Sequence, residues 1–476
     1  MRSYLKHYID GAWVESDGGT RHEVINPATE EAVTEITLGS NADVDKAVAA
    51  AKAAFETFSQ TSVDERVALI ERIITEYQKR SDDLAQAIAL EMGCPISMAK
   101  MAQVDARIGH WNAAIKALKE FEFEERIGNS AVVHEPIGVV ALITPWNWPL
   151  NQIISKVAPA LAAGCTMVLK PSEEAPSCAA ILAEVFDAAG VPKGVFNLVQ
   201  GDGPGVGTAL SKHRNVDMVS FTGSTRAGIM VAKNAADTVK RVHQELGGKS
   251  PSLVLEGADM EKAVKGTLMS VLVNSGQSCI APTRLLVPAD RQDEAVAIAT
   301  AIMKGTQVGD PMEEGRHIGP LVNRAQFEKV QDLIKKGMEE GAKLEVGGPG
   351  RPAGVESGYY VSPTLFSHVT NDMTIAREEI FGPVVTIIPY KDEAEGVRIA
   401  NDTDYGLSAV VHGPAEATKR VAPKLRAGMV YVNGGQPDPN LPFGGYKQSG
   451  NGREHGKFGL AEFMEVKSVL NAYAEA

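Results

Sequence analysis

A cysteine in a short polar segment is the first residue that could do chemistry. Residues 274–284 read NSGQSCIAPTR, in which Cys279 follows a glycine, a glutamine and a serine. A free thiol is only a few per cent thiolate at neutral pH, so a nucleophilic cysteine must be activated by its surroundings. Such a role for Cys279 requires a general base, a donor for an oxyanion and an electrophile to attack.

Two neighbouring residues are candidate bases. The segment HQELGGKSP contains Glu245 at the end of an apolar run, before Gly247 and Gly248. A carboxylate held among apolar groups has its charged form disfavoured and could act as a general base for water, whereas the alternative is a surface glutamate at a strand end. His243 lies two residues earlier on the same face of the expected strand, which leaves a Cys–His pair open.

A rigid asparagine is a candidate oxyanion donor. Asn147 lies between two tryptophans and two prolines in the segment PWNWP, directly after an apolar run. A side-chain amide fixed by such surroundings can donate to a developing oxyanion. The alternative is an asparagine in a turn, which is the commoner role of Asn beside Pro.

Two glycine-containing segments could bind the phosphates of a dinucleotide. Residues 201–207 (GDGPGVG) resemble a phosphate loop, but Val206 occupies the third glycine position of the usual spacing, so a flexible turn is predicted. In FTGST, Gly223 ends a strand and a helix begins near Ser224. Backbone N–H groups at such a helix start can hold a pyrophosphate.

The segment KPSE follows another apolar run and suits a ribose. A carboxylate at Glu173 could accept both hydroxyls of an adenosine ribose and would repel a 2′-phosphate. This favours NAD, although Lys170, three residues earlier, leaves NADP possible. The alternative is a solvated pair at a helix start, with Ser172 or Glu173 as the capping residue.

Composition limits the class of partner and the compartment. The net charge of −13 argues against binding of nucleic acid or of an anionic membrane surface, and no apolar run approaches the ~20 residues of a membrane span. Cys94, Cys165 and Cys178 form no CxxC pair and are expected to be small buried hydrophobes in a reducing cytoplasm. No histidine spacing indicates a metal site, so none is expected.

The elements that must position these residues follow from apolar periodicity. Intervals of three and four residues predict helices over 43–58 and 62–93, with Asp43 and Ser62 as caps, so about the first 120 residues should be mainly helical. Alternation then predicts a two-stranded ribbon over 121–136 with a turn at Gly128.

From Gly138 onward short apolar strands alternate with helices. Five such strands, up to residue 246, predict a parallel, doubly wound sheet, whose ligands lie outside the carboxyl ends of the strands. The candidate residues named above follow these strands. A second α/β region follows, and residues 462–474 are expected to form a strand that pairs with the ribbon.

Taken together, the motifs resemble the aldehyde dehydrogenase superfamily, in its NAD(P)-dependent, hydrolytic type. The likeness extends over nearly the whole chain and rests on motifs that occur in the family's order. They are YIDGAW and NPAT near the start, then PWNWP, KPSE, FTGST, ELGGKSP, GQSC, EEIFGPV and PFGGYKQSGNGRE.

The resemblance implies an α/β fold with a Rossmann-like cofactor domain, a catalytic α/β domain and a small β arm for oligomerisation. The implied boundaries are 1–117 with 137–247, 248–447, and 118–136 with 459–476. A homo-oligomer, either a dimer or a homotetramer, is expected.

The resemblance also implies roles for single residues. Cys279 would be the nucleophile, Glu245 the general base and Asn147 the oxyanion donor. The implied cofactor-binding residues are Trp146, Lys170, Glu173, Gly223, Ser224, Leu246, Glu379 and Phe381. The implied substrate pocket comprises Trp148, Gln152, Ser155, Ser278, Ile280 and Phe443 with residues 436–442, and Lys156 and Glu454 are similar to proton-relay positions.

The expected reaction is oxidation of an aldehyde to a carboxylic acid through a thiohemiacetal and a thioester on Cys279, which water activated by Glu245 then hydrolyses. The cofactor's positive ring and a helix start could both favour the thiolate. Three alternatives remain: a CoA-acylating relative, which generally lacks this glutamate, a cofactor-free Cys–His hydrolase, and a non-catalytic scaffold. The small polar Gln152 and Ser155 suggest a roomy pocket, and the sequence indicates no arginine placed for a distal carboxylate.

Overall fold

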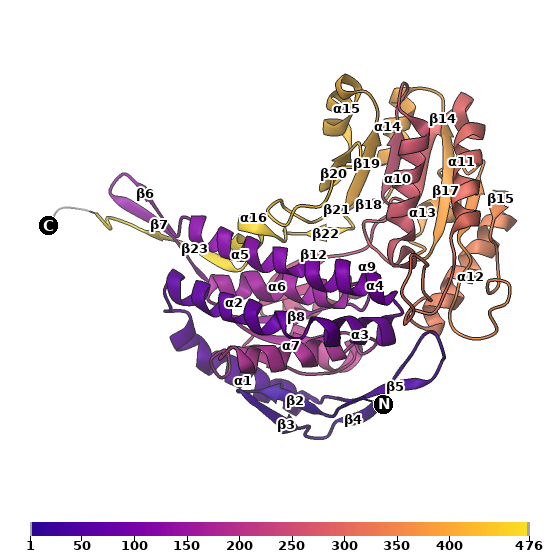
Figure 1. Cartoon of the computed structure of the whole chain (residues 1–476). Coiled ribbons are helices and arrows are strands. Elements are labelled where there is room, and N and C mark those ends of the chain that lie inside the picture. Colours follow the sequence, from indigo (N-terminus) through magenta and orange to yellow (C-terminus); the bar gives the residue numbers. More distant parts are fainter. Residues whose placement is uncertain (1, 474–476) are drawn as a thin grey trace.

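The structure, a computed structural model, describes residues 2–473 (Figure 1). Residues 1 and 474–476, which belong to the predicted cofactor domain and to the predicted C-terminal arm, lie outside the described residues. A large body with one sheet, a second lobe with another sheet and a projecting arm make up the chain. Within the described part, no helix is both long and apolar enough to cross a membrane.

The sheet of the large body has eight strands in the order β22-β12-β11-β8-β9-β10-β2-β3. Its five central strands are parallel, as predicted, and their burial on both faces explains their continuous apolar character. The eight strands are β2 (Lys6–Ile9), β3 (Ala12–Glu15), β8 (Val139–Ile143), β9 (Thr166–Lys170), β10 (Phe196–Leu198), β11 (Met218–Thr222), β12 (Arg241–Glu245) and β22 (Gly450–Asn451).

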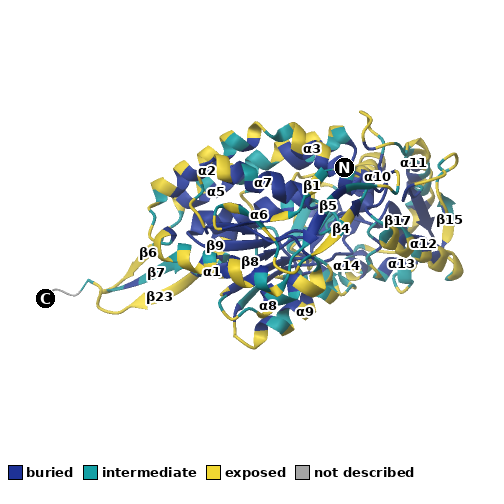
Figure 2. Ribbon diagram, turned by 90° about the horizontal axis from the view of Figure 1, so that it is seen from below, coloured by how far each residue is buried: buried dark blue, intermediate teal, exposed yellow. Residues whose placement is uncertain are grey.

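Helices cover both faces of this sheet (Figures 1 and 2). The chain runs outward from β8 to β9 and β10, then returns to β11 and β12 on the other side, so the strand order reverses beside β8. The helices are α1 (Asn41–Phe58), α2 (Val63–Gln78), α3 (Ser81–Met92), α4 (Ile96–Met98), η1 (Ala99–Val104), η2 (Asp105–Arg107), α5 (Ile108–Glu120), α6 (Pro149–Ala163), α7 (Ser177–Ala188), η3 (Gly203–Gly207), α8 (Thr208–Lys212), α9 (Thr225–Ala236) and α16 (Gly456–Glu462).

Two details of the predicted N-terminal helices are wrong. The cap of α1 is Ser40, and Asp43 is the third helical residue, whose carboxylate accepts from the Ser40 backbone N–H in a capping box. The predicted helix over 62–93 is two helices, α2 and α3, with Ser62 capping α2 as expected.

Strands in the first 38 residues were not predicted. They are β2 and β3, which extend the large sheet, and a separate sheet of β1 (Arg2–Tyr4), β4 (Thr20–Ile25) and β5 (Ala32–Leu38). A local signal was present, because Asp10 and Gly11 form the two-residue turn between β2 and β3, with φ of +52° and +72°. An Asp-Gly pair is a strong indicator of such a hairpin.

The second sheet has seven strands in the order β15-β16-β17-β14-β13-β19-β20, parallel except at the β15 edge. The strands are β13 (Pro251–Val254), β14 (Arg284–Pro288), β15 (Lys343–Val346), β16 (Thr364–Ser367), β17 (Val384–Tyr390), β19 (Ser408–His412) and β20 (Met429–Val432); β18 (Tyr405–Gly406) pairs with β21 (Tyr446–Lys447). Its helices are α10 (Met260–Leu272), η4 (Val273–Gly276), η5 (Ala289–Arg291), α11 (Gln292–Gly305), α12 (Arg324–Glu339), α13 (Thr374–Arg377), α14 (Glu393–Asn401), α15 (Ala415–Val421) and η6 (Ala422–Lys424).

The arm consists of β6 (Glu124–Ile127), β7 (Ser130–Pro136) and β23 (Met464–Val469), in the order β23-β7-β6. The predicted ribbon and its pairing with the C-terminal strand are confirmed, although the first strand begins at Glu124. Much of the arm is exposed and projects from the body (Figure 2).

Candidate active site

The candidate residues converge on one edge of the large sheet. Asn147 follows β8, Lys170 ends β9, Gly223 follows β11 and Glu245 ends β12. Because these strands are parallel, their carboxyl ends lie at the same edge, and the reversal of strand order beside β8 opens a crevice there. Residues 246–250 then lead directly into β13 of the second sheet, so the edge faces the junction of the two sheets.

The segment that carries Cys279 has an unusual backbone path. Asn274, Ser275 and Gly276 have φ of +56°, +56° and +76°, and all three are buried. A Cβ on Gly276 would lie 2.0 Å from the Gly382 carbonyl oxygen, so a close approach of two segments requires glycine there. Positive φ at two non-glycine residues is a costly conformation that is typical of functional segments.

Asn147 is hydrogen-bonded to the segment that carries Cys279. Its side chain is buried and its Nδ2 donates to the Gln277 carbonyl at 3.2 Å. Asn274 Nδ2 donates in turn to the Asn147 carbonyl at 2.6 Å and to the Gln277 carbonyl at 3.2 Å. Asn147 does lie in a bend between β8 and α6, as the turn alternative expected, but it is buried there. Asn274 was not identified from the sequence, because no motif distinguished its side chain.

Cys279 has no helix start to activate it. It lies in a turn after η4 and before β14, so the expectation of a helix start at this thiol is wrong. Burial raises the pKa of the Cys279 thiol, and the nearby carboxylates of Glu379, Glu245 and Glu454 raise it further. The thiol is therefore protonated until positive charge is brought to it.

Glu245 is not a surface residue. Only 2% of it is exposed, and neither side-chain oxygen has a hydrogen-bond partner within the described residues. Burial raises the pKa of this carboxyl well above its ordinary value, and the charge of Glu454 adds to the effect. A buried carboxyl without partners is suited to exchange a proton with water.

The alternative Cys–His pair is not formed. His243 Nδ1 contacts Ser220 Oγ at 3.2 Å, and its Nε2 lies 3.6 Å from Glu245 Oε1. Burial lowers the pKa of His243 to about 3, so the imidazole is neutral and this contact is not an ion pair. No hydrogen bond joins His243 to Cys279 anywhere in the described chain.

A buried ion pair lies beside Glu245. Lys156 Nζ, on α6, lies 2.5 Å from Glu454 Oε1, and both side chains are almost wholly buried. Burial would raise the pKa of Glu454, but the charge of Lys156 holds it below its ordinary value. Glu454 reaches this position because its backbone pairs with that of Phe443 and because β22 pairs with β12.

The predicted ribose residues form an ion pair at the same edge. Lys170 Nζ lies 2.9 Å from Glu173 Oε2, and Lys170 is buried. The alternative of a solvated helix-start pair is wrong, because α7 begins only at Ser177. Beyond the end of β11, Ser224 caps α9 by accepting from the Ala227 N–H.

The glycine-rich segment after β10 has a different structure from that predicted. Residues 203–207 form a short π-helix, and the Asp202 carboxylate caps it by accepting from the Gly205 N–H at 2.7 Å. The proline and glycines suggested a flexible turn, but the Asp202 cap stabilises a turn of helix over these residues.

The remaining predicted cofactor residues meet between the sheets. The rings of Trp146 and Phe381 pack edge to face, with centroids 5.4 Å apart. Glu379 accepts from the Gly248 N–H at 2.8 Å, and a Cβ on Gly247 would lie 2.5 Å from Glu379 Oε2. Leu246 is buried beside Gly228, where a Cβ would come within 2.6 Å of it.

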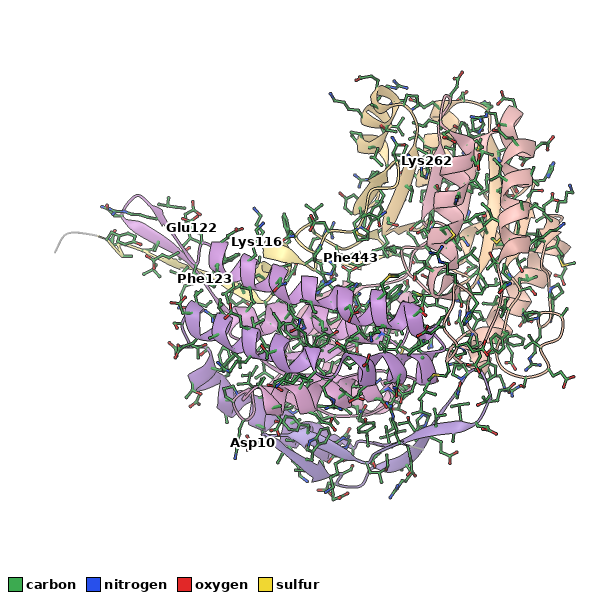
Figure 3. All side chains as sticks on the ribbon, in the orientation of Figure 1. Asp10, Lys116, Glu122, Phe123, Lys262 and Phe443 are labelled. Atoms are coloured by element: carbon green, nitrogen blue, oxygen red, sulfur yellow. The ribbon has the colours of Figure 1, made fainter. Side chains whose placement is uncertain are left out.

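A cavity of about 700 Å³ opens at Cys279. Five of the six residues predicted for the substrate pocket line it, and Phe443 lies between the body and the second lobe (Figure 3). Ser155 does not; it is buried beside a smaller hollow, where its Oγ contacts His455 Nε2 at 3.1 Å. The lining includes Trp148, Gln152, Ser278, Ile280, Phe443 and most of the segment 436–442.

The cavity wall also contains an arginine that the sequence did not indicate. Arg107, together with His110, lines the same cavity as Cys279. The expectation that no arginine is available to a distal carboxylate is therefore wrong. Arg107 belongs to no motif and lies far from the others along the chain, so only the packing of η2 and α5 against α6 could reveal it.

The fold and the site define an α/β enzyme of the oxidoreductase class, in which a dinucleotide-type sheet edge faces a half-buried thiol and a buried carboxyl. Residues 13–469 match the model of the aldehyde dehydrogenase family, and the chain belongs to this family. The predicted fold class and enzyme class, an aldehyde dehydrogenase that uses a nicotinamide dinucleotide, are thereby confirmed.

Individual relatives match along their whole length. A 3-succinoylsemialdehyde-pyridine dehydrogenase from a Pseudomonas species is 55% identical over 472 residues, which cover 99% of each chain. The crystal structure of a cysteine-to-alanine mutant of aldehyde dehydrogenase C from Pseudomonas syringae, complexed with NAD+ and octanal, has a TM-score of 0.98 at 51% identity, covering 99% of this chain and 98% of that one. An aldehyde dehydrogenase from Bartonella henselae has a TM-score of 0.97 at 48% identity, covering 98% and 99%.

Proposed function

We propose that this aldehyde dehydrogenase uses Cys279 as the nucleophile, Asn147 as the oxyanion donor and Glu245 as the general base for hydrolysis. The observation that carries the proposal is the hydrogen-bonded unit of Asn147, Asn274 and the Cys279 segment at a cavity, with an unpartnered carboxyl buried nearby. An amide, a thiol and a carboxyl held together in this way are suited to acyl chemistry.

The residues at the sheet edge fit NAD. Lys170 and Glu173 would hold the adenosine ribose, the start of α9 at Ser224 the pyrophosphate, and Glu379 the nicotinamide ribose. The electrostatics of Cys279 support this assignment, because three carboxylates raise the pKa of a thiol that must ionise. When bound, NAD supplies a two-electron acceptor and a positively charged ring.

The chain's own residues then act on the aldehyde. The Cys279 thiolate adds to the carbonyl carbon, which becomes a thiohemiacetal with an anionic oxygen. Asn147 Nδ2 uses one N–H toward Gln277 and has a second N–H for this oxygen, together with the Cys279 backbone N–H. After oxidation to the thioester, Glu245 takes a proton from water, the hydroxide adds to the acyl carbon, and the thiolate leaves.

Substitution of the base tests this assignment. Glu245→Gln should release one equivalent of NADH per active site in a burst and then turn over at least ~100-fold more slowly, since only the hydrolytic step needs the base. Rapid mixing followed by mass spectrometry should detect the acyl group on the protein. Cys279→Ala is the control and should give neither burst nor adduct; NAD-dependent oxidation by Cys279→Ala would refute the scheme.

Acyl-CoA formed by the wild-type enzyme with added CoA would indicate the acylating type instead.

Cofactor preference depends on Glu173. We expect kcat/KM for NAD to exceed that for NADP, because the carboxylate of Glu173 repels a 2′-phosphate while Lys170 tolerates it. Glu173→Gln should reduce the ratio of NAD to NADP activity by about 10-fold, measured with one aldehyde at saturation. A wild-type preference for NADP would contradict the assignment.

Three finer features belong to the proposal: the oligomeric state, the compartment and the substrate. The exposed apolar side chains of the arm support a homo-oligomer, a dimer or a tetramer. The four cysteines, all without disulfide partners, support a reducing cytoplasmic compartment. For the substrate, one relative is named for a pyridine semialdehyde and another was crystallised with octanal, so a chain of several carbons is expected to fit.

A further inference from the structure

Arg107 reaches the cavity of Cys279 from the end of η2. Three contacts fix its guanidinium: Nη2 donates to the Ala102 carbonyl at 3.0 Å, and Nη1 contacts the Asn151 Oδ1 and, at 3.3 Å, His110 Nε2. A guanidinium has five N–H groups, so two remain. Its Nε is buried and has no partner among residues 2–473.

The charge of Arg107 is not neutralised by the protein. Within the described residues, no carboxylate lies within ion-pair distance of it. Burial lowers the pKa of Arg107 to about 10, which still leaves the side chain protonated at neutral pH. His110, its neighbour, is neutral because burial, with the charges of His455 and Arg107, lowers the His110 pKa well below its ordinary value. Arg107 is half-buried. A partly desolvated cation without a counter-ion favours an anion in the cavity.

One acidic residue lines the cavity, and its carboxylate is already engaged. Asp438 is exposed, and its Oδ1 accepts from the backbone N–H and the side-chain Nδ2 of Asn440, each at 2.8 Å. It therefore contributes to the mouth of the cavity and is no partner for Arg107 in the described structure.

The wall of the cavity contains both Cys279 and Arg107. Glu379, Glu245 and Glu454 lie outside this wall and disfavour negative charge at Cys279. Arg107 provides a positive charge in the same wall. A substrate with an aldehyde at one end and an anion at the other would therefore bind in one orientation, with its aldehyde directed to the thiol.

We infer that Arg107 selects aldehydes that carry a carboxylate at the far end of the chain. The inference rests on the proposed function, because it needs Cys279 as the reacting end. A carboxylate can accept a charge-assisted hydrogen bond from a guanidinium, and bonds of this kind are about twice as strong as neutral ones. A neutral aldehyde leaves the same N–H groups without a charged acceptor.

The test compares three probes that differ only at the far end. Glutaric semialdehyde, its methyl ester and hexanal are assayed with NAD on the wild type, Arg107→Gln and Arg107→Lys, with ω-carboxylated aldehydes of four to eight carbons to find the best length. In the wild type kcat/KM should be highest for the acid. Arg107→Gln should lower kcat/KM for the acid about 10- to 100-fold and change that for hexanal less than about threefold. For the acid, kcat/KM of Arg107→Lys should lie between the values of the wild type and of Arg107→Gln.

The control is Arg72→Gln, which also removes an arginine bonded to a backbone carbonyl but one that does not line the cavity. Equal kcat/KM for acid and ester, or equal losses for all three probes in Arg107→Gln, would overturn the inference and leave the proposed function intact. Should Arg107→Gln not fold, the wild-type ratio of acid to ester still decides. No oxidation of any aldehyde by the wild type would instead reject the proposed function.

Discussion

At Cys279 and Glu245 the protein holds two groups in protonation states opposite to those the reaction needs. Burial and neighbouring carboxylates raise the pKa of both, so the resting site is a thiol beside a carboxylic acid. In the mechanism that we propose, reactivity depends on positive charge that arrives with the cofactor, and the Lys156–Glu454 pair is the proposed route for proton loss from Glu245. An uncharged resting site limits side reactions of the thiol.

The pH dependence of hydrolysis should report this arrangement. Glu245 must be ionised to act, so kcat should rise with pH wherever hydrolysis limits turnover. Glu454→Gln removes a negative charge that raises the pKa of Glu245, so the rising limb should move to lower pH. Lys156→Met removes a positive charge that lowers the pKa of Glu245, so the rising limb of kcat should move to higher pH. Profiles of kcat against pH for the two variants check these shifts. Shifts of both variants in the same direction would contradict the proposed role of the pair.

At the level of single residues, the sequence predicted the groups that belong to motifs and missed those defined by packing. Cys279, Glu245 and Asn147 were singled out, and the structure brings all three to one sheet edge. Asn274 and Arg107 were missed, because a buried hydrogen bond and a cavity wall depend on contacts between distant segments.

At the level of elements, the linker from β12 to β13 connects the two sheets and carries part of the site. Gly248 allows its backbone to approach the Cys279 carbonyl oxygen, which a Cβ would meet at 2.3 Å. The same residue donates its N–H to Glu379. One short segment therefore sets the relative positions of the thiol and the Glu379 carboxylate.

Gly248→Ala should consequently displace the Cys279 segment. We expect kcat/KM to fall about 100-fold and the free energy of unfolding to decrease by about 1–3 kcal/mol, because an added methyl group strains a closely packed site. Steady-state kinetics and urea unfolding measure the two effects. Gly305→Ala is the matched control, since nothing lies within 4 Å of its added Cβ. Unchanged activity in Gly248→Ala would show that the segment tolerates the shift.

The strands with continuous apolar runs were predicted well, since buried parallel strands have an unmistakable composition. The strands β1 to β3 were missed because they have only three or four residues each, and the Asp10-Gly11 turn was the clearest signal for β2 and β3. The longer β4 and β5 were missed because charged and polar residues interrupt their apolar pattern. The capping residue of α1 was misplaced by three positions because both members of a capping box are typical of a helix start.

At the level of the whole molecule, the arm presents apolar side chains to solvent. Val466, in β23, is 65% exposed, and Leu470, the residue after β23, is 79% exposed, whereas Phe463 and Met464 at the start of this segment are buried. Exposed apolar groups on a projecting sheet are typical of an interface between copies of a chain.

Charges on the arm should therefore prevent assembly. The double substitution Val466→Glu and Leu470→Glu should reduce the mass measured by light scattering to that of a smaller species, without the core damage that removal of Phe463 would cause. Val239→Glu, at another exposed apolar residue (91% exposed), is the control and should leave the mass unchanged. An unaltered mass in the double variant would exclude assembly through this surface.

The large sheet has edges made by opposite ends of the chain, β3 near the N-terminus and β22 near the C-terminus. During synthesis, the β12 edge that carries Glu245 stays open until residues 450–451 leave the ribosome, and Lys156 has no Glu454 to pair with before then. The cavity at Cys279 is itself lined by residues within 428–443 and by His455, so it too is completed only when this C-terminal segment has emerged. A chain that ended before residue 450 would lack both β22 and Glu454, and so would have no complete site.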